Sequence, residues 1–175
     1  MAKTINPLIR LDEINNIQNI AKLAFSIFEP FSSYSLNELE QYLIDNLNPK
    51  ISRQLLLDGK VIGFYLFQYK SLPQFLTTIP ANNYLEFNST LDELNRYNTL
   101  TGIEGVALGI LPEYRSLGFG KLLLNYSDSL PKDYIWGQHL DKLNNLAYWL
   151  KKRRHIASFF SPEDQDIIHI TASTL

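Results

Sequence analysis

The chain has 175 residues, of which 45% are hydrophobic and 13% aromatic, a composition typical of a folded globular protein with one domain. Its formal net charge of −2 argues against a nucleic-acid partner, because nucleic acids attract proteins that carry a basic face. The sequence contains no cysteine, which excludes disulfides, thiolate metal ligands and a cysteine-bound reaction intermediate.

The start of the sequence predicts neither export nor membrane insertion. Residues 1–13 (MAKTINPLIRLDE) lack the apolar core of a signal peptide. No stretch approaches the roughly 18 consecutive apolar residues that a membrane-spanning helix requires. We therefore expect a cytoplasmic protein that has no membrane partner.

Apolar spacing and one capping signal predict the first elements. Residues 7–11 are typical of a short strand, and apolar residues at helical spacing predict a helix over 14–28. Ser35 and Glu38 have the spacing of a capping box, in which each side chain accepts a hydrogen bond from the other's backbone amide. A second helix is therefore expected to begin after Ser35.

A hairpin and an irregular stretch come next. Two apolar runs, 53–57 and 60–67, flank Asp58-Gly59, a pair that favours the positive φ angles of a type I′ turn. Prolines interrupt residues 69–101, where Thr90 and Glu93 have the spacing to cap a short helix. A connection of this length in a compact domain is usually functional or mobile.

The second half of the chain predicts alternating strands and helices. The expected strands are 102–111, 134–140, 156–160 and 167–171, and the expected helices are 118–129 and 143–154. Neither an internal repeat nor a linker divides the chain. We therefore expect a single domain over residues 1–175, with an insert at about 69–101 between strands.

Residues 111–124 (LPEYRSLGFGKLLL) carry the most informative motif. They lead from a predicted strand into a predicted helix and contain Gly118 and Gly120. The first turn of a helix has unpaired amides, and glycines allow a phosphate group to approach them. Arg115 and Lys121 add positive charge. The glycine spacing differs from that of the P-loop and of the dinucleotide-binding fingerprint.

This segment resembles the acetyl-CoA-binding motif of the GCN5-related N-acetyltransferases. That family has the pattern Arg/Gln-x-x-Gly-x-Gly/Ala after an apolar strand, and Arg115-x-x-Gly118-x-Gly120 matches it. The order of the predicted elements is similar as well. The resemblance implies an α/β (α+β) fold with a mixed, mostly antiparallel, twisted sheet of six to seven strands and about four helices. It also implies that two central parallel strands splay apart.

The resemblance implies acetyl-CoA as the cofactor and assigns residues to its site. The loop amides would wrap the pyrophosphate of coenzyme A, and the end of the preceding strand would pair with its pantetheine arm. A later segment of the family, Asn-x-x-Ala-x-x-x-Tyr, is matched in part. The expected cofactor-binding residues are Leu108, Gly109, Ile110, Arg115, Ser116, Leu117, Gly118, Phe119, Gly120, Lys121, Asn144 and Lys151.

Acetyl transfer to an amine needs a proton acceptor, and Glu104 is our first choice. A free alkyl amine is mostly protonated at neutral pH, so a base assists its attack. Glu104 lies eleven residues before Arg115, the same distance as the glutamate base of the family's histone-acetylating branch. A strand-end glutamate in water, or one paired with a surface cation, is the alternative. His139, in the next predicted strand, is a reserve base or a substrate contact, with a structural role as its alternative.

The residue that would donate a proton to the leaving thiolate differs from the one in the family pattern. The family places a tyrosine at the position of Lys151, whereas here Tyr148 lies one turn earlier in the predicted helix. Tyr148 is the candidate acid, and packing against the sheet is its alternative role. Asn144 matches the family's asparagine, and Lys151 is assigned to the cofactor.

The acceptor amine is expected to contact aromatic residues. The resemblance places the segment between the first two helices on the acceptor side, which selects Phe28, Phe31 and Tyr34. These residues favour a small or partly apolar amine, or a peptide N-terminus. We expect no metal site, because the histidines lack ligand spacing. A homodimer is left open.

The predicted function is acetyl-CoA-dependent N-acetyltransfer to a primary amine by direct attack in a ternary complex. Two alternatives stay open at this stage. One is a non-catalytic domain that binds or senses acyl-CoA. The lysine at position 151, where the family has a tyrosine, supports this alternative. The other is an acyltransferase that uses a longer acyl group.

Overall fold

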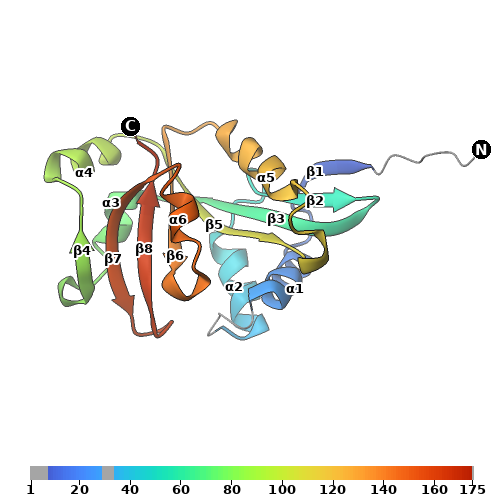
Figure 1. Cartoon of the computed structure of the whole chain (residues 1–175), viewed down its shortest axis with the longest axis horizontal. Coiled ribbons are helices and arrows are strands. Elements are labelled where there is room, and N and C mark those ends of the chain that lie inside the picture. The colour runs from blue at the N-terminus through green and yellow to red at the C-terminus, as the bar shows by residue number, and fades with distance from the viewer. Residues whose placement is uncertain (1–7, 29–33, 175) are drawn as a thin grey trace, which may run out of the picture. The chain divides into compact units, whose positions relative to one another are not determined.

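The computed structural model describes residues 8–28 and 34–174 (Figure 1). Within these ranges it contains eight strands and six α-helices of a mixed α/β fold. The described chain divides into two compact units. The first unit contains residues 8–28, 34–66 and 107–130, and the second contains residues 67–106 and 131–174.

The first unit combines a hairpin with three helices. Antiparallel pairing connects neighbouring strands in the order β1-β2-β3. Its elements are β1 (Ile9–Glu13), α1 (Ile17–Phe28), α2 (Leu36–Asn46), β2 (Arg53–Leu57), the larger part of β3 (Lys60–Tyr69), the end of β5 (Gly102–Ile110) and α5 (Phe119–Asp128). The expected strands and helices of this part are therefore confirmed.

Two local sequence signals of the first unit form the structures that they predict. The Ser35 hydroxyl accepts a hydrogen bond from the Glu38 amide at 3.3 Å, and the Glu38 carboxylate accepts one from the Ser35 amide at 2.7 Å. This capping box begins α2. Asp58 and Gly59 have φ angles of 49° and 83°, as a type I′ turn requires. The predicted hairpin is confirmed.

A close backbone contact joins β3 to the end of β5 in the first unit. The Leu111 amide donates a hydrogen bond to the Ile62 carbonyl at 2.9 Å. A Cβ atom on Gly63 would lie 2.8 Å from the Gly109 carbonyl oxygen and against the Ile110 side chain. Glycine is required at position 63 because no side chain fits between the two strands. This contact positions the loop that follows β5.

The second unit contains the single parallel strand pair that the structure describes. β5 runs parallel to β6 (Tyr134–Leu140), in a register from Gly102↔Tyr134 to Gly105↔Gly137. β6 pairs antiparallel with β8 (Asp166–Ala172), and β8 with β7 (Arg154–Ser161). The strand order continues to β4 (Tyr84–Phe87), which pairs antiparallel with β7.

The insert is more regular than the sequence suggested. It forms α3 (Leu72–Leu76), a 3₁₀ turn at Ala81–Asn83, the strand β4 and α4 (Leu91–Asn98). Thr90 and Glu93 make the expected capping box of α4. The sequence gives no sign of β4, because this strand has only four residues and depends on pairing with β7.

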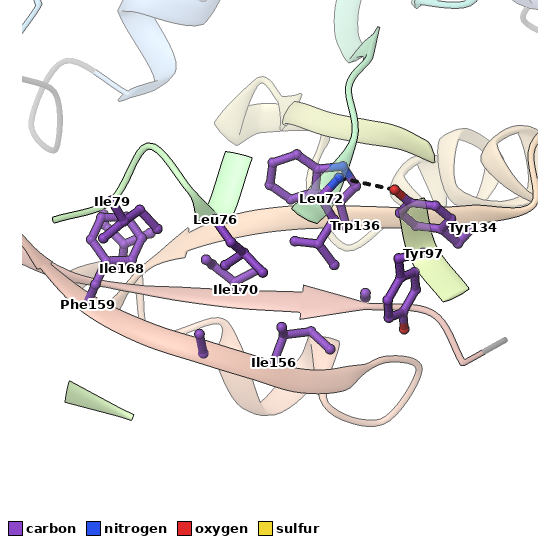
Figure 2. Packing of buried hydrophobic residues seen from close by; sticks show 12 residues of the cluster. Leu72, Leu76, Ile79, Tyr97, Tyr134, Trp136, Ile156, Phe159, Ile168 and Ile170 are labelled. Atoms are coloured by element: carbon purple, nitrogen blue, oxygen red, sulfur yellow. Dashed lines mark hydrogen bonds between the residues drawn. The ribbon is translucent and has the colours of Figure 1, made fainter. Parts of the chain in front are cut away.

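The core of the second unit lies between the insert and one face of the sheet (Figure 2). The phenolic oxygen of Tyr134 accepts a hydrogen bond from the Leu72 amide at 3.1 Å, which ties α3 to β6. The Phe75 ring lies 5.0 Å from the Trp136 ring. Buried members of this cluster include Leu72, Leu76, Ile79, Tyr97, Tyr134, Trp136, Ile156, Ile168 and Ile170.

The predicted helix over 143–154 is wrong. A 3₁₀ turn occupies Asp141–Leu143, Asn144 has a left-handed φ of 50°, and α6 extends only over Leu146–Trp149. β7 then begins at Arg154. The expected counts of six to seven strands and about four helices are low for a different reason: the insert forms short elements, α3, β4 and α4, and β4 depends on pairing with β7.

Candidate functional site

The loop between β5 and α5 lies within the first unit and is largely exposed. Leu108, Gly109 and Ile110 end β5, and a 3₁₀ turn follows at Pro112–Tyr114. Arg115, Ser116, Leu117 and Gly118 are exposed, whereas the Phe119 side chain is buried beneath the start of α5. The structure therefore places the predicted loop residues together on one continuous segment.

The N-terminus of α5 has no side-chain cap. Gly118 is the residue before the helix, has a φ of 85° and makes no side-chain cap hydrogen bond. Glycine suits this left-handed conformation, which other residues rarely adopt. Cβ atoms built on Gly118 or Gly120 would meet no atom within 4 Å. In the described chain, the start of α5 is therefore open beside these two glycines.

Two cations accompany these amides. The Arg115 Nε atom donates a hydrogen bond to the Ile110 carbonyl at 3.0 Å, which holds the side chain across the loop. Ser116 has a left-handed φ of 63°. Lys121 is exposed in the first turn of α5. Helix amides, a helix dipole and two cations together form an arrangement suited to a phosphate or pyrophosphate group.

Glu104 lies in the second unit and is buried, with only 2% of its surface exposed. Its Oε2 atom accepts a hydrogen bond from Gln68 Nε2 at 2.5 Å, and its Oε1 atom accepts one from Gln138 Nε2 at 2.7 Å. The Lys70 Nζ atom lies 3.4 Å from Oε2. Of the alternative roles, a glutamate in water is therefore wrong, whereas pairing with a partly exposed cation is found, in the contact with Lys70.

Sequence reasoning missed the three partners of Glu104. Gln68 is in β3, Lys70 directly follows it, and Gln138 is in β6. Each is an ordinary polar residue in its local sequence, and only the pairing of β3, β5 and β6 brings them together. A buried charge needs such partners, since an isolated carboxylate in the interior is strongly unfavourable.

His139 is held in the interior of the second unit. Its Nε2 atom lies 2.8 Å from the Thr171 hydroxyl, and its ring stacks on Trp149. Burial, assisted by the positive charge of Arg153, lowers the pKa of His139 to about 3. Such a histidine is neutral and a weak proton acceptor near neutral pH.

The residues assigned from the later family segment lie around α6. Asn144 is exposed and precedes the helix, Tyr148 is in it with 44% of its surface exposed, and Lys151 follows it on the surface. Tyr148 and Lys151 do not share one face of a long helix, because α6 ends at Trp149. Tyr148 contacts the Trp149 ring edge-to-face at 5.4 Å.

The expected acceptor contacts are described only in part. Phe28 is half-buried at the end of α1 and lies 6.3 Å from the Phe64 ring. Tyr34 is exposed and lies 6.3 Å from the Tyr42 ring, both distances being between ring centroids. Phe31 lies outside the described residues.

Residues 8–28 and 34–174 contain neither a metal-ligand cluster nor a membrane-spanning helix. No cluster of three or more histidine, aspartate or glutamate side chains there has the arrangement needed to hold a metal ion. In the same residues, no helix is both long enough and apolar enough to cross a membrane.

Comparison of the structure with solved structures identifies the fold. A polyamine N-acetyltransferase from Drosophila melanogaster matches with a TM-score of 0.66 and 10% sequence identity, over 97% of this chain and 100% of its own. NAA60 from Arabidopsis thaliana, crystallised with acetyl-CoA, matches with a TM-score of 0.60 and 17% identity, over 95% and 97% of the two chains. The chain has the fold of the GCN5-related N-acetyltransferases.

This fold also occurs in proteins with other chemistry. The GNAT-like decarboxylase GphF, solved with isobutyryl-CoA, matches with a TM-score of 0.62 and 15% identity, over 95% of this chain and 98% of its own. In sequence, no family model and no curated protein matches the chain. The likeness therefore shows the fold, and the chemistry has to be argued from the site residues.

Proposed function

We propose that the chain is an acetyl-CoA-dependent N-acetyltransferase that acts on a primary amine. The observation that carries this proposal is the uncapped N-terminus of α5, with Gly118 and Gly120 open and Arg115 beside it. Proteins with the same fold have been crystallised with acetyl-CoA or with bisubstrate analogues of coenzyme A.

The residues present fit coenzyme A. The amides from Ser116 to Gly120 would bind its pyrophosphate, since they can donate hydrogen bonds and the helix dipole favours negative charge. The Arg115 amide donates to the Pro112 carbonyl at 3.2 Å, so this residue would contribute through its side chain. The backbone of Leu108 to Ile110 would pair with the pantetheine arm. Asn144 and Lys151 stay proposed as further contacts. Bound acetyl-CoA would supply the acetyl thioester.

Glu104 is the proposed proton acceptor for the amine. It is the buried carboxylate of the strand that leads into the loop, and Gln68 and Gln138 fix the orientation of both its oxygen atoms. An oriented carboxylate can accept a proton from an ammonium group and so leave a neutral nucleophile. Because the chain has no cysteine, direct attack by the amine is the proposed route.

A non-catalytic acyl-CoA-binding domain is the second candidate. The short α6 favours it, because this helix does not continue to Lys151, where the family has its tyrosine acid. Tyr148 stays our proposed acid on the basis of its exposure. An acyltransferase for longer acyl groups is a variant of the main proposal. The decarboxylase solved with isobutyryl-CoA supports this variant, because its ligand carries a longer acyl group.

The proposed function is tested first by cofactor binding. We expect acetyl-CoA and coenzyme A to raise the melting temperature of the wild type, because a ligand of the folded state stabilises it. Gly120→Trp should abolish this rise without unfolding the protein, since the position is open. Leu122→Trp, also in α5 and on its exposed side, is the matched control and should keep the rise.

Turnover then separates the candidates. Release of free thiol from acetyl-CoA with a panel of primary amines is expected for the enzyme. Tight cofactor binding without turnover across the panel would favour the binding domain. If Gly120→Trp still binds acetyl-CoA with the wild-type affinity, the loop is not the cofactor site.

A further inference from the structure

The Lys70 ammonium group has surroundings unlike those of an ordinary surface ion pair. Its Nζ atom lies 3.4 Å from the Glu104 carboxylate, which is 2% exposed, while the Lys70 side chain is 35% exposed. The carboxylate is therefore buried, and its cation is the member of the pair that reaches water. Because an unpaired buried carboxylate is unfavourable, a cation at this place stabilises the ionised form of Glu104.

Two aromatic rings complete the surroundings of the ammonium group. The Lys70 Nζ atom lies 4.7 Å from the Phe75 ring centroid and 5.9 Å from the Trp136 ring centroid. Both distances are within the range of cation–π attraction. Phe75 comes from α3 and Trp136 from β6, so the rings approach the cation from different elements of the second unit. A carboxylate and two aromatic rings recognise an alkylammonium ion by charge and by dispersion.

The carboxylate is oriented without help from Lys70. Gln68 and Gln138 each donate a hydrogen bond to one of the Glu104 oxygen atoms. Replacement of the Lys70 ammonium by another one would therefore leave the carboxylate in place. Glu104 is therefore oriented to bind a cation, whichever cation is present, and does not depend on Lys70 for its position.

The Lys70 side chain can leave while its backbone stays. The Trp136 indole donates a hydrogen bond to the Lys70 carbonyl at 2.8 Å, and the Lys70 amide donates one to the Gly102 carbonyl at 3.3 Å. These bonds anchor the main chain. The ammonium group is carried on a flexible four-carbon stem and is partly solvated, so it can exchange with an external ammonium ion.

We propose that Glu104, Phe75 and Trp136 form a binding site for a primary alkylammonium group, and that the Lys70 side chain fills this site until a ligand displaces it. Identification of that ligand as the acceptor amine rests on the acetyltransferase function proposed above. The acceptor is then a primary alkylamine with methylene groups beside the nitrogen. An amine with an adjacent carboxylate would be repelled by Glu104.

Binding of n-butylammonium chloride to the wild-type protein tests the proposal directly. The chain has two tryptophans, so an ¹H–¹⁵N NMR spectrum contains two indole signals. The Trp136 indole reports on the site through its bond to Lys70, while Trp149 serves as an internal reference. We expect n-butylammonium to shift the Trp136 signal selectively and n-butanol not to. Equal shifts of both signals, no shift, or the same response to n-butanol would overturn the proposal.

A variant that empties the site gives a second test. Lys70→Ala should lower the melting temperature, and n-butylammonium should restore it by at least about 2 °C, the shift expected of a modest stabilisation in a chain of this size. Lys70→Ala with Glu104→Gln should not respond. If Lys70→Ala does not fold, Lys70→Gln takes its place in the same measurement.

Lys60→Ala is the matched control. The Lys60 ammonium also lies beside a carboxylate, Glu113 at 3.7 Å, and over an aromatic ring, Tyr114 at 5.2 Å, but Glu113 is exposed. No restoration is expected there. A similar response of Lys60→Ala would show a nonspecific salt effect and overturn the proposal. None of these measurements contains acetyl-CoA, so a failed proposed function would leave their outcome unchanged.

Discussion

The imidazole of His139 stacks on the indole of Trp149, with ring centroids 5.2 Å apart and ring planes inclined by 27°. The His139 side chain is 6% exposed, and the Thr171 hydroxyl is within hydrogen-bond distance of its Nε2 atom. Burial is the largest cause of its low pKa, and the charge of Arg153 adds to the effect. Burial therefore keeps this histidine neutral inside the second unit.

This neutral histidine makes the folded state sensitive to acid. The pKa of His139 is about 3 in the folded protein and about 6.5 when unfolded, so between these values only the unfolded state binds the proton. The stabilisation is complete above pH 6.5 and is lost as the pH falls toward 3, on the order of 5 kcal/mol in all. We expect His139→Gln to flatten the decline of the unfolding free energy between pH 7 and 5, measured with urea.

His155→Gln is the control for that experiment. The pKa of His155 is also lowered, first by burial and then by His169, but its side chain is less deeply buried. His155→Gln should therefore flatten the decline of the unfolding free energy less than His139→Gln does. A wild-type slope in His139→Gln would contradict the explanation.

Glu104→Gln is expected to impair catalysis without impairing cofactor binding. If Glu104 accepts the proton of the amine, kcat should fall by roughly 10²- to 10⁴-fold, the usual contribution of a general base. The rise in melting temperature with acetyl-CoA should stay, because the loop lies elsewhere in the chain. Glu113→Gln, at an exposed carboxylate, is the control and should keep the wild-type rate. An unchanged rate in Glu104→Gln would exclude it as the base.

Gly120→Ala should stabilise the fold and keep cofactor binding. The position lies in the first turn of α5, and a Cβ atom there would meet nothing within 4 Å. Alanine in a helix is more favourable than glycine by up to about 1 kcal/mol. The family pattern allows alanine at this position, so a methyl group should leave room for the phosphate, unlike the side chain of Gly120→Trp. Urea unfolding and calorimetric titration with coenzyme A measure the two effects, and loss of binding in Gly120→Ala would contradict the loop assignment.

Gly63→Ala should have the opposite effect on stability. Its Cβ atom would approach the Gly109 carbonyl oxygen, which belongs to the backbone and cannot turn away. Overpacking of this kind costs about 1–3 kcal/mol, and it would also displace the strand that leads into the loop. Urea unfolding measures the loss, with Gly120→Ala as the comparison. A neutral result would mean that β3 and β5 separate easily.

The ion pair between Glu93 and Arg154 should couple α4 to β7. The hydrogen bond from Arg154, together with the Thr90 amide, lowers the pKa of Glu93 to about 2. This stabilisation is present above the unfolded pKa and is lost as the pH falls from about 4.5 toward 2. A double-mutant cycle with Glu93→Gln and Arg154→Gln should give a favourable coupling at pH 7 that fades below pH 4. A coupling independent of pH would argue against the ion pair.

Several features were predictable because their causes lie within a few residues. The capping box of Ser35 and Glu38 joins residues three apart, and Asp58-Gly59 supplies its own turn geometry. The loop from Arg115 to Gly120 is likewise a local sequence of strand end, glycines and helix start. Such signals act before any distant contact forms, so the sequence alone predicted these elements and the motif that resembles the acetyltransferase family.

The remaining features depend on residues that meet only after folding. Strand β4 exists through its pairing with β7, more than 60 residues away, and α6 stops short although its local sequence favours a longer helix. Gln68 and Gln138 reach Glu104 from positions 36 and 34 residues distant. Burial and ion pairing in the interior decide such contacts, and these are properties of the packed sheet. Tertiary structure therefore decided what surrounds the carboxylate, while the sequence by itself determined where the loop lies.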